Sequence, residues 1–223
     1  MKLATLVEHL TVQLGKPLPG PEAQLSLMSV KNLQEYEKRF KELEKGYDIH
    51  TARQSSVLIL LYEKEGTVFL PLIKRPEYEG VHSGQIAFPG GKVEPDDTDV
   101  EATALRETFE EIGVPSDQII ILGKLTPVFI PPSRFWVNVV LGYATNIPDF
   151  IPDNHEVAQL IEFPLDHLWK VGNLEERTVT SSPNWKMNAP GYLYQEHFIW
   201  GATSMILTEL RELIQSNSQA TKL

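Results

Sequence analysis

The sequence predicts an α/β fold in which helices pack on a mixed β-sheet, with a helical extension at the amino terminus. Two continuous apolar runs, at 56–62 and 67–73, are separated by a short polar turn and predict a hairpin whose strands are buried on both faces. A charged segment at 99–112 has helical periodicity and ends at Gly113. Further strands and helices along the rest of the chain indicate a sandwich of helices and sheet.

The first fifty residues predict helical segments that contain no chemical motif. Leucine and valine recur at helical spacing over residues 2–14, which predicts an amphipathic helix. Glycine and proline at 15–21 end this helix and predict an irregular stretch, after which 32–45 predicts a second, charged helix. We therefore expect residues 1–50 to form a helical extension that serves as a cap or a dimerisation arm, and residues 51–223 to form the main domain.

The chain after the hairpin predicts short strands, one long loop and a closing helix. The expected elements are a strand at 85–88, the helix at 99–112, strands at 119–125 and 137–144 joined by a proline-rich loop at 127–136, short helices at 156–161 and 165–169, and a strand that turns into a helix over 198–215. The aromatic residues Phe129, Phe135 and Trp136 of the long loop could stack on a nucleobase. Core packing or a dimer contact is the more common fate of such side chains.

The most informative stretch joins a glycine turn at Gly90 and Gly91 to the helix at 99–112. At 100° per residue, three carboxylates share one side of this helix and three apolar side chains share the other. The carboxylates belong to Glu107, Glu110 and Glu111, and the apolar stripe consists of Leu105, Phe109 and Ile112. Carboxylates packed this closely repel one another unless a cation lies among them. The pattern therefore predicts a metal site, although acidic runs on helices are more often solvated surfaces.

The order of glycine turn, acidic residue, Arg-Glu, Glu-Glu and glycine resembles the signature of the Nudix hydrolase family, G-x5-E-x7-R-E-U-x-E-E-x-G-U, where U is aliphatic. Residues 106–114 match this signature except at Thr108, which is polar where an aliphatic residue is expected. The first half is one residue longer and carries Asp97 in place of glutamate, which resembles the coenzyme A pyrophosphatase branch of the family. The resemblance covers about residues 55–215 and implies the Nudix-like α/β/α sandwich with a mixed sheet.

Two further segments resemble the coenzyme A branch. The first contains Arg75, His82 and the Phe-Pro-Gly-Gly run at 88–91, but Gly80 stands where that branch has an arginine. This difference removes one expected phosphate contact. The second is the Ile-Trp-Gly-Ala-Thr run at 199–203.

The carboxylates and the family resemblance together suggest the catalytic and metal-binding residues. The expected ligands of Mg²⁺ or Mn²⁺ are the side chains of Glu107, Glu110 and Glu111 and, by resemblance, the carbonyl oxygen of Gly90. These hard cations prefer oxygen ligands, neutralise diphosphate oxygens and lower the pKa of a bound water. A general base is needed as well if all three glutamates bind metal. The candidates are Glu107 and Glu156, of which Glu156 precedes an expected helix and could instead be an acid stabilised by the helix dipole.

Four basic side chains are candidate substrate contacts. Arg75 and His82 precede the glycine turn and could touch phosphate or nucleotide, or act only as a strand-end charge and a loop hydrogen-bonder. Lys92 could contact phosphate or be solvated. For Arg106, at the border between the two helix faces, we favour an ion pair that holds a glutamate side chain over a substrate contact.

The composition limits the class of function. With 223 residues and 42% apolar content, the chain can form one domain with extensions and a well-filled core. Its formal net charge of −10 argues against binding to nucleic acids or anionic membranes, and it makes divalent cations necessary for a polyphosphate substrate. The absence of cysteine excludes disulfides and thiol chemistry. Because no segment resembles a signal peptide or a membrane span, we expect a cytoplasmic protein.

These features predict a metal-dependent hydrolase that cleaves the pyrophosphate linkage of a nucleoside diphosphate derivative. Coenzyme A or acyl-CoA is the first choice of substrate, because of the resemblance to that branch, and would give 3′,5′-ADP and phosphopantetheine. ADP-ribose, NADH and dinucleoside polyphosphates are alternatives. So is a nucleotide-sensing module without catalysis, against which the intact carboxylate set argues. A homodimer is a further expectation, because the apolar stripe at 2–14 has no assigned partner.

Overall fold

The structure is a computed structural model. It describes residues 1–29, 33–34, 37, 52–78, 82–130, 133–182 and 185–216. The second helix expected in the amino-terminal extension, at 32–45, falls mostly outside the described residues, and so does Gly80. Among the helices of the described ranges, none has the length and apolar character that crossing a bilayer requires.

A mixed sheet of seven strands forms the centre of the described fold. The strands are β1 (Arg53–Lys64), β2 (Thr67–Lys74), β3 (Ile86–Ala87), β4 (Gly90–Lys92), β5 (Ile119–Ile130), β6 (Phe135–Ala144) and β7 (Gln159–Pro164). The order is β3-β2-β1-β6-β5, with β4 paired to β1 and β7 paired to β2. β1 and β6 are parallel, whereas β1 and β2 form the antiparallel hairpin that the sequence predicts.

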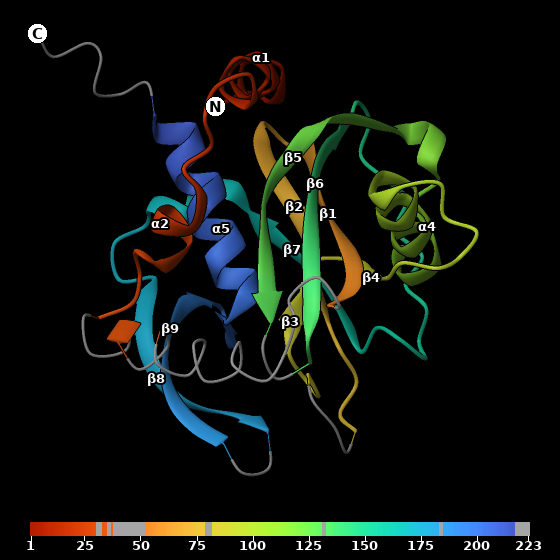
Figure 1. Ribbon diagram of the computed structural model, residues 1–223. Helices are drawn as coiled ribbons and strands as arrows, with labels where there is room; N and C mark the ends of the chain where they lie inside the picture. The colour runs from red at the N-terminus through yellow and green to blue at the C-terminus, as the bar shows by residue number, and fades with distance from the viewer. Residues whose placement is uncertain are drawn as a thin grey trace, which may run out of the picture.

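Helices cover both faces of this sheet, as Figure 1 shows. They are α1 (Leu3–Leu14), α2 (Gly20–Leu25), α4 (Val100–Ile112), α5 (Ala202–Gln215) and the 3₁₀-helices η2 (Ser116–Gln118) and η3 (Leu165–Trp169). α4 packs on one face, whereas α5 and α1 pack on the other. The predicted α/β/α sandwich is therefore confirmed.

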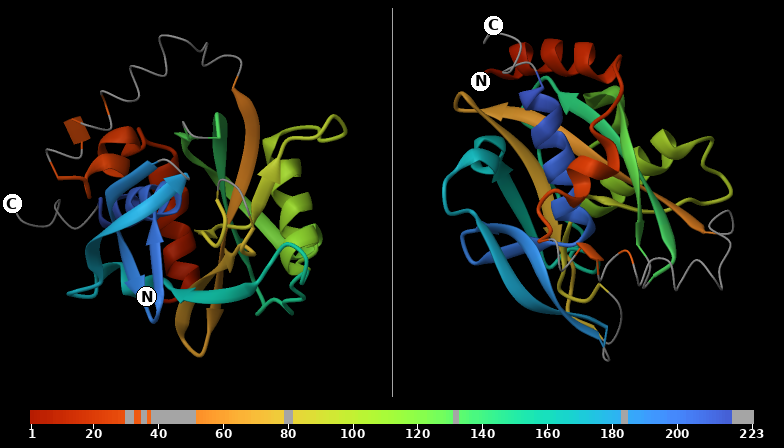
Figure 2. Two further views of the ribbon diagram at one scale, coloured as in Figure 1. Left: turned by 90° about the horizontal axis from the view of Figure 1, so that it is seen from below. Right: turned by 60° about the vertical axis from the view of Figure 1, so that its left-hand side comes forward.

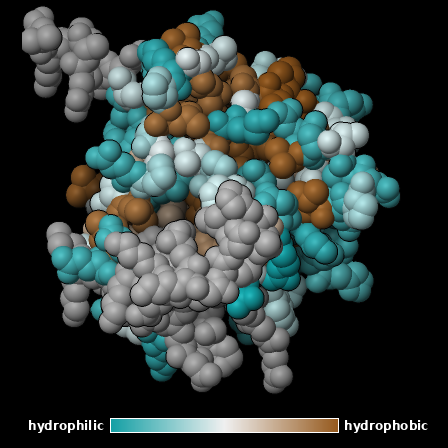
Figure 3. Space-filling model, in the orientation of Figure 1, coloured by the Kyte–Doolittle hydropathy of each residue, from teal (hydrophilic) through white to brown (hydrophobic). Residues whose placement is uncertain are grey.

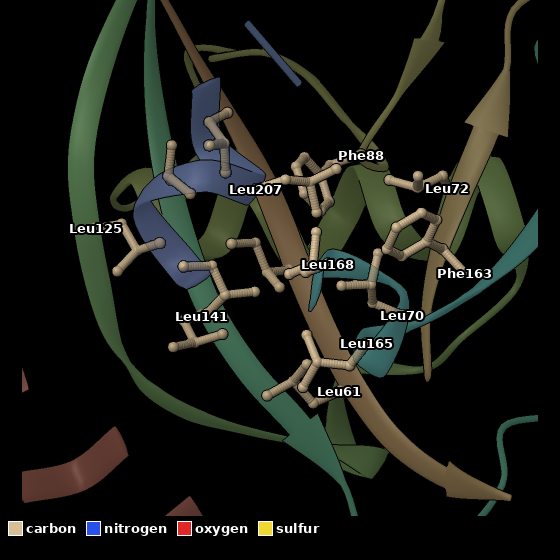
Figure 4. Packing of buried hydrophobic residues seen from close by; sticks show 14 of the residues in the cluster. Leu61, Leu70, Leu72, Phe88, Leu125, Leu141, Phe163, Leu165, Leu168 and Leu207 are labelled. Carbon is tan, nitrogen blue, oxygen red and sulfur yellow. The ribbon is translucent and has the colours of Figure 1, made fainter. Parts of the chain in front are cut away.

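Strand β1 contributes side chains to both layers. Leu58 packs on the side of Ile112 in α4, and Leu61 packs on the side of α5, where Figure 4 shows it in one cluster with Leu141 and Leu207. Successive side chains of a strand point to opposite faces of the sheet. A continuous apolar run is therefore what a strand between two helical layers requires.

A second, smaller sheet precedes α5. It contains β8 (Leu174–Ser182), β9 (Trp185–Tyr194) and β10 (His197–Trp200), and Figure 2 shows the β8–β9 hairpin standing apart from the central sheet. The sequence predicted β10 and its continuation into α5 but did not predict β8 and β9. Because β8 is polar and mostly exposed, it lacks the apolar run that marks a buried strand.

The predicted loop at 127–136 is wrong over most of its length. β5 continues to Ile130, and β6 begins at Phe135. Pro127 lies in β5 where the register with β6 shifts between Leu125 and Val128. A register shift tolerates a residue that has no N–H to donate. Pro127 therefore marks an irregularity within a strand, and six of the ten residues that were expected to form a loop belong to β5 or β6.

The predicted helix at 156–161 is also wrong, because β7 occupies Gln159–Pro164 and pairs with β2. Ile161 and Phe163, two residues apart, are both buried, which is the period of a strand. The short helical piece that was expected at 165–169 is confirmed as the 3₁₀-helix η3.

The apolar stripe of α1 has a partner within the chain. Leu3, Leu6 and Leu10 are buried in the same cluster as residues of β5 and α5. The homodimer was expected because this stripe had no assigned partner, and that reason no longer holds. Val12 of α1 is nevertheless 57% exposed, and Figure 3 shows apolar surface at the end of the molecule where α1 lies. The homodimer stays a prediction, as does the division of the chain at residue 50.

A buried carboxylate joins the amino-terminal segment to the rest of the fold. Glu209 of α5 has no exposed surface, and its Oε1 accepts hydrogen bonds from the backbone N–H groups of Gly20 (3.2 Å) and Thr126 (3.3 Å). Its Oε2 accepts a bond of 2.8 Å from Nε2 of Gln24. One side chain thus connects α2, β5 and α5.

Replacing this carboxylate should destabilise the protein. Glu209→Leu leaves three donors without their acceptor, and we expect the free energy of unfolding to fall by about 3 kcal/mol. Glu212→Leu on the same helix removes a partly exposed partner of Arg211 and should change it by less than about 0.5 kcal/mol. Urea denaturation followed by circular dichroism measures both. Equal midpoints for the two variants would contradict this role.

Candidate active site

Helix α4, which carries the acidic residues, has a capping residue at each end. The side chain of Asp99 accepts hydrogen bonds from the N–H groups of Glu101 and Ala102, at 2.9 and 2.8 Å, and so caps the amino terminus of α4. Gly113, with φ of 75°, ends the helix and donates to the carbonyl of Phe109. The predicted helix is therefore confirmed.

The face through which α4 packs differs from the prediction. Phe109 of the expected apolar stripe is 56% exposed, whereas Thr108 and Glu111 are buried beside Ile112. The Thr108 hydroxyl donates to the carbonyl of Ala104 at 2.6 Å, so it brings no unpaired polar group into the core. The helix is thus turned so that its acidic side lies partly against the sheet.

Glu111 is the most deeply placed of the three glutamates, with 1% of its side chain exposed. It accepts a hydrogen bond of 2.8 Å from the N–H of Gly90, and Nη2 of Arg75 lies 3.8 Å from its Oε1. Burial raises the pKa of Glu111 to about 7, with help from the charges of Glu107 and Glu156 and against the effect of Arg75 and Gly90. A cation beside this carboxylate would favour its ionised form.

The glycine pair allows β4 to lie close to both β1 and Glu107. Gly90 and Gly91 lie in β4, not in a tight turn as predicted, and pair with β1. A Cβ atom at Gly91 would lie 2.3 Å from Cδ of Glu107, and one at Gly90 would lie 2.3 Å from the carbonyl oxygen of Ser56. Because neither position has space for a side chain, Glu107 rests directly on the strand backbone. Burial also raises the pKa of Glu107.

Arg106 makes the ion pairs that we favoured from the sequence. Its Nη1 donates at 2.9 Å to both Glu107 and Glu110. Its Nε and Nη2 donate to the two carboxylate oxygens of Asp97, at 2.9 and 3.0 Å, and Nη2 also donates to the carbonyl of Lys92. Since a guanidinium has five N–H donors, a substrate contact by Arg106 would have to displace a protein acceptor.

Asp97 is a site residue whose partner the sequence did not indicate. Its bonds to Arg106 hold its pKa well below the usual range, and the Thr103 hydroxyl donates to it as well. Asp97 lies before the start of α4, eight residues separate it from Arg106, and the helical period of α4 does not extend to it, so no local pattern predicts the pair. Through this pair, Asp97 connects the longer loop of the motif to helix α4.

Arg75 and His82 occupy the approach to β4. Nη2 of Arg75 donates to the carbonyl oxygen of Gly90 at 3.3 Å and so contacts one expected metal ligand while lying near a second, Glu111. Nδ1 of His82 lies 2.9 Å from Oε1 of Gln85. Burial lowers the pKa of His82, as does the charge of Arg75, against the effect of Gln85. This histidine is therefore expected to be neutral at pH 7.

Glu156 reaches the site through a loop that α4 holds. The N–H groups of Ile151 and Asp153 donate to the carbonyls of Ile112 and Glu111, at 2.9 and 3.0 Å. Glu156 is exposed, and its charge contributes to the raised pKa values of Glu107 and Glu111. The helix expected after Glu156 is a bend followed by β7, so the alternative role as a helix-terminal acid is wrong.

The remaining candidates lie toward solvent. The side chain of Lys92 is exposed at the end of β4, and that of Glu110 is 51% exposed on the outer side of α4. The structure thus gathers most of the predicted residues around β4 and the second half of α4. Lys92 and His82 lie at the margin of this group.

The donor set fits a hard divalent cation. Carboxylates and a carbonyl oxygen are the ligands that Mg²⁺ and Mn²⁺ prefer, and the crowded carboxylates have raised pKa values that a cation would reverse. Across the described residues, no three acidic or histidine side chains stand close enough together to hold an ion in their present positions. Glu107 and Glu110 instead point to Arg106, which neutralises them.

Comparisons with known proteins connect this site to a family. The NUDIX domain family matches residues 52–184, a range that contains every candidate site residue. The Nudix hydrolases NudL of Yersinia pestis (strain Pestoides F) and Yersinia pseudotuberculosis serotype O:1b (strain IP 31758) are each 35% identical over 168 residues, which cover 74% of this chain and 81% of each relative. The solved structure of RenU, a Nudix hydrolase from M. smegmatis, has a TM-score of 0.51 at 16% identity, covering 74% of this chain and 88% of that one, and shows the same fold.

The buried state of Glu111 predicts how stability depends on pH when no metal is present. Because its pKa is raised from 4.5 to about 7 in the fold, the unfolded chain loses this proton first as the pH rises. In EDTA, the free energy of unfolding should fall by roughly 3 kcal/mol between pH 4.5 and 8 on account of this group. Glu111→Gln should lack that decrease, whereas Glu101→Gln, in the first turn of the same helix, should keep it. Parallel urea-denaturation profiles for wild type and Glu111→Gln across this pH range would contradict the assignment.

Proposed function

The chain belongs to the Nudix hydrolase family of pyrophosphatases, and we propose that it uses Mg²⁺ or Mn²⁺ to cleave the diphosphate linkage of coenzyme A or an acyl-CoA. The observation that carries the proposal is the position of Glu111. This acid is buried, bonded to the N–H of Gly90 and next to Glu107, which rests on Gly91. An acid in this position suits the binding of a cation better than it suits the stability of the fold.

The proposed metal ligands are the carboxylates of Glu107, Glu110 and Glu111 and the carbonyl oxygen of Gly90. Metal bound there would neutralise diphosphate oxygens and lower the pKa of the attacking water. Arg106 and Arg75 now occupy several of these oxygen atoms. Because a metal would bind the same oxygen atoms, Arg106 would give up part of its bonds to Glu107 and Glu110, and Arg75 its bond to Gly90. Arg75 could then donate to a phosphate oxygen of the substrate.

We assign the general base to Glu156. Its carboxylate is exposed and lies close enough to act on the charges of Glu107 and Glu111, whereas Glu107 is held by Arg106 against Gly91. In this reaction a water molecule attacks one phosphorus atom, Glu156 accepts its proton, and the bridging P–O bond breaks. The products from coenzyme A are 3′,5′-ADP and phosphopantetheine.

The choice of coenzyme A rests on the longer motif loop with Asp97, the Phe-Pro-Gly-Gly run at 88–91 and the run at 199–203. The pairing of Asp97 with Arg106 supports this choice by giving the longer loop a structural purpose in the site. ADP-ribose, NADH and dinucleoside polyphosphates remain alternative substrates of the same chemistry. Cytoplasmic location is part of the proposal, because coenzyme A is an intracellular type of substrate.

Turnover of coenzyme A tests the proposed substrate. Purified protein with Mg²⁺ should release 3′,5′-ADP, detected by liquid chromatography, and EDTA should abolish the release. Glu111→Gln should lower kcat by at least about a hundredfold, since it removes a metal ligand. Glu101→Gln, which changes an acid paired with Lys124 on the same helix, should keep kcat within about twofold. Brisk cleavage of ADP-ribose with none of coenzyme A would overturn the choice of substrate.

A second pair of variants tests the general base. Glu156→Gln should lower kcat by about 10²- to 10⁴-fold and remove the acidic limb of the pH–rate profile, while it leaves Mn²⁺ affinity almost unchanged. Glu107→Gln should instead weaken Mn²⁺ binding, which electron paramagnetic resonance measures directly. If Glu107→Gln removes the acidic limb and Glu156→Gln does not, the base is Glu107.

A further inference from the structure

The three aromatic residues near the β5–β6 turn are divided between the two faces of the sheet. The guanidinium of Arg53 lies 4.3 Å from the ring centroid of Phe135. Trp136, the next residue of β6, pairs with Phe129 of β5, and their ring centroids are 6.4 Å apart at 37°. Since neighbouring side chains of a strand alternate, Trp136 and Phe129 face away from the Arg53–Phe135 pair.

Trp136 and Phe129 lie on the face that carries α4. Val140, four residues after Trp136 in the same strand, packs with Ala104 and Ile112 of α4. The register of β6 with β1 is continuous from Phe135 to Tyr143, so residues at even spacing from Val140 keep its direction. The aromatic pair and the catalytic helix therefore share one side of the sheet.

The same face leads without interruption to the carboxylates. Gln54 of β1 pairs with Trp136, and its Oε1 accepts a hydrogen bond of 3.2 Å from Nδ2 of Asn138. Ser56 pairs with Asn138 on one side and with Gly91, on which Glu107 rests, on the other. We name the surface formed by Gln54, Phe129, Trp136 and Asn138 the sheet shelf.

Helix α4 leaves this surface uncovered. The apolar side chains that pack beneath α4 begin at Leu58 in β1 and Val140 in β6, beyond the shelf. Figure 1 shows β5 and β6 extending past the helix. Gln54 is exposed, and Phe129, Trp136 and Asn138 are half-buried. The described helices thus leave part of Trp136, Asn138 and Gln54 open to solvent on the side that leads to Glu107.

We propose that the sheet shelf binds the nucleobase of the substrate, stacked on Trp136 with Phe129 beside it. This inference rests on the proposed function and specifies how the same site holds a nucleotide. At standard strand spacing, Trp136 lies one strand and two residues from Ser56, roughly 8 Å, and two strands and two residues from Gly91, roughly 12 Å. A ribose together with the first phosphate group spans such a distance, so a base on Trp136 can place its diphosphate beside Glu107.

The chemistry of the shelf matches a nucleobase better than it matches an aliphatic group. Stacking on an aromatic ring accepts any base, because every base has a π-face. The amide groups of Gln54 and Asn138 stand at the edge of the stack, and side-chain amides can pair with the donors and acceptors on the edge of a base such as adenine. The arm of the substrate beyond the second phosphate would then point away from the shelf.

Steady-state kinetics test the shelf in the active enzyme. With coenzyme A, or with whichever adenine-containing diphosphate the protein cleaves, Trp136→Ala should raise KM by about tenfold or more and keep kcat within about threefold. Trp136→Phe should retain KM within about threefold. Phe135→Leu, in the same strand but on the opposite face, is the matched control and should leave KM unchanged. Thermal melts confirm that each variant is folded.

Product inhibition identifies the part of the substrate that the shelf holds. Trp136→Ala should weaken inhibition by 3′,5′-ADP about tenfold and leave inhibition by pyrophosphate, which has no base, unchanged. Weaker inhibition by phosphopantetheine instead of 3′,5′-ADP would overturn the proposal. So would unchanged KM together with a shift in oligomeric mass by sedimentation, which would make the shelf an interface between copies of the chain.

Fluorescence tests the shelf without catalysis, so the two proposals can fail separately. AMP should quench tryptophan fluorescence of the wild type, and the quenching should disappear in Trp136→Phe but persist in Trp200→Phe. If coenzyme A is not cleaved but this quenching is seen, the substrate choice fails and the shelf stands. If coenzyme A is cleaved but Trp136→Ala keeps both KM and AMP binding, the shelf fails and the proposed function stands.

Discussion

The contact between the carboxylate of Glu111 and the N–H of Gly90, 2.8 Å long, joins helix α4 to strand β4 of the central sheet. An acid that is 1% exposed is expensive to bury, and the backbone donor and the nearby Arg75 offset only part of this penalty, since its pKa remains raised. Beside this contact, Gly91 leaves space for the carboxylate of Glu107, and Gly90 allows β4 to lie against the backbone of β1. The contact also turns α4 on its axis, which explains why Phe109 faces solvent while Thr108 is buried.

Around this contact, arginine side chains balance the negative charge of the site. Arg106 bonds to Asp97, Glu107 and Glu110 at once, and Asp97 and Glu107 raise its own pKa. In a chain with a net charge of −10, the site would otherwise repel any polyphosphate. The ion pairs hold the carboxylates in place near the strand, so that a bound cation, as we propose, would exchange one set of charge partners for another. Such preorganisation is what a metal site on a rigid helix requires.

The two layers of the sandwich have separate tasks. On the side of α4, one continuous sheet surface contacts the carboxylate of Glu107 at Gly91 and, two residues further along the strands, carries the aromatic pair of Phe129 and Trp136. On the opposite side, α5 and the amino-terminal helices bury the larger apolar cluster, and Glu209 fastens α2 to β5. The face that packs against α5 therefore supports the sheet, while the face that carries α4 holds the candidate site.

Local patterns in the sequence were enough for the β1–β2 hairpin, for α4 with its ends and for the set of carboxylates on that helix. Apolar runs, capping residues and helical spacing depend on interactions within a few residues of the chain, so they can be recognised without the fold. The resemblance of residues 106–114 to a family signature added the α/β/α architecture. Together these identified the family and most of the residues that surround β4.

Tertiary structure alone decided which face of α4 is buried, that 127–136 belongs largely to strands, and that β8 and β9 form a hairpin. It also decided the partners of Asp97 and Arg75, and it placed Phe135 and Trp136 on opposite faces. Each of these features depends on hydrogen bonds or packing between segments distant in the chain. Sequence spacing carries no record of such contacts, because their geometry exists only once the sheet has assembled.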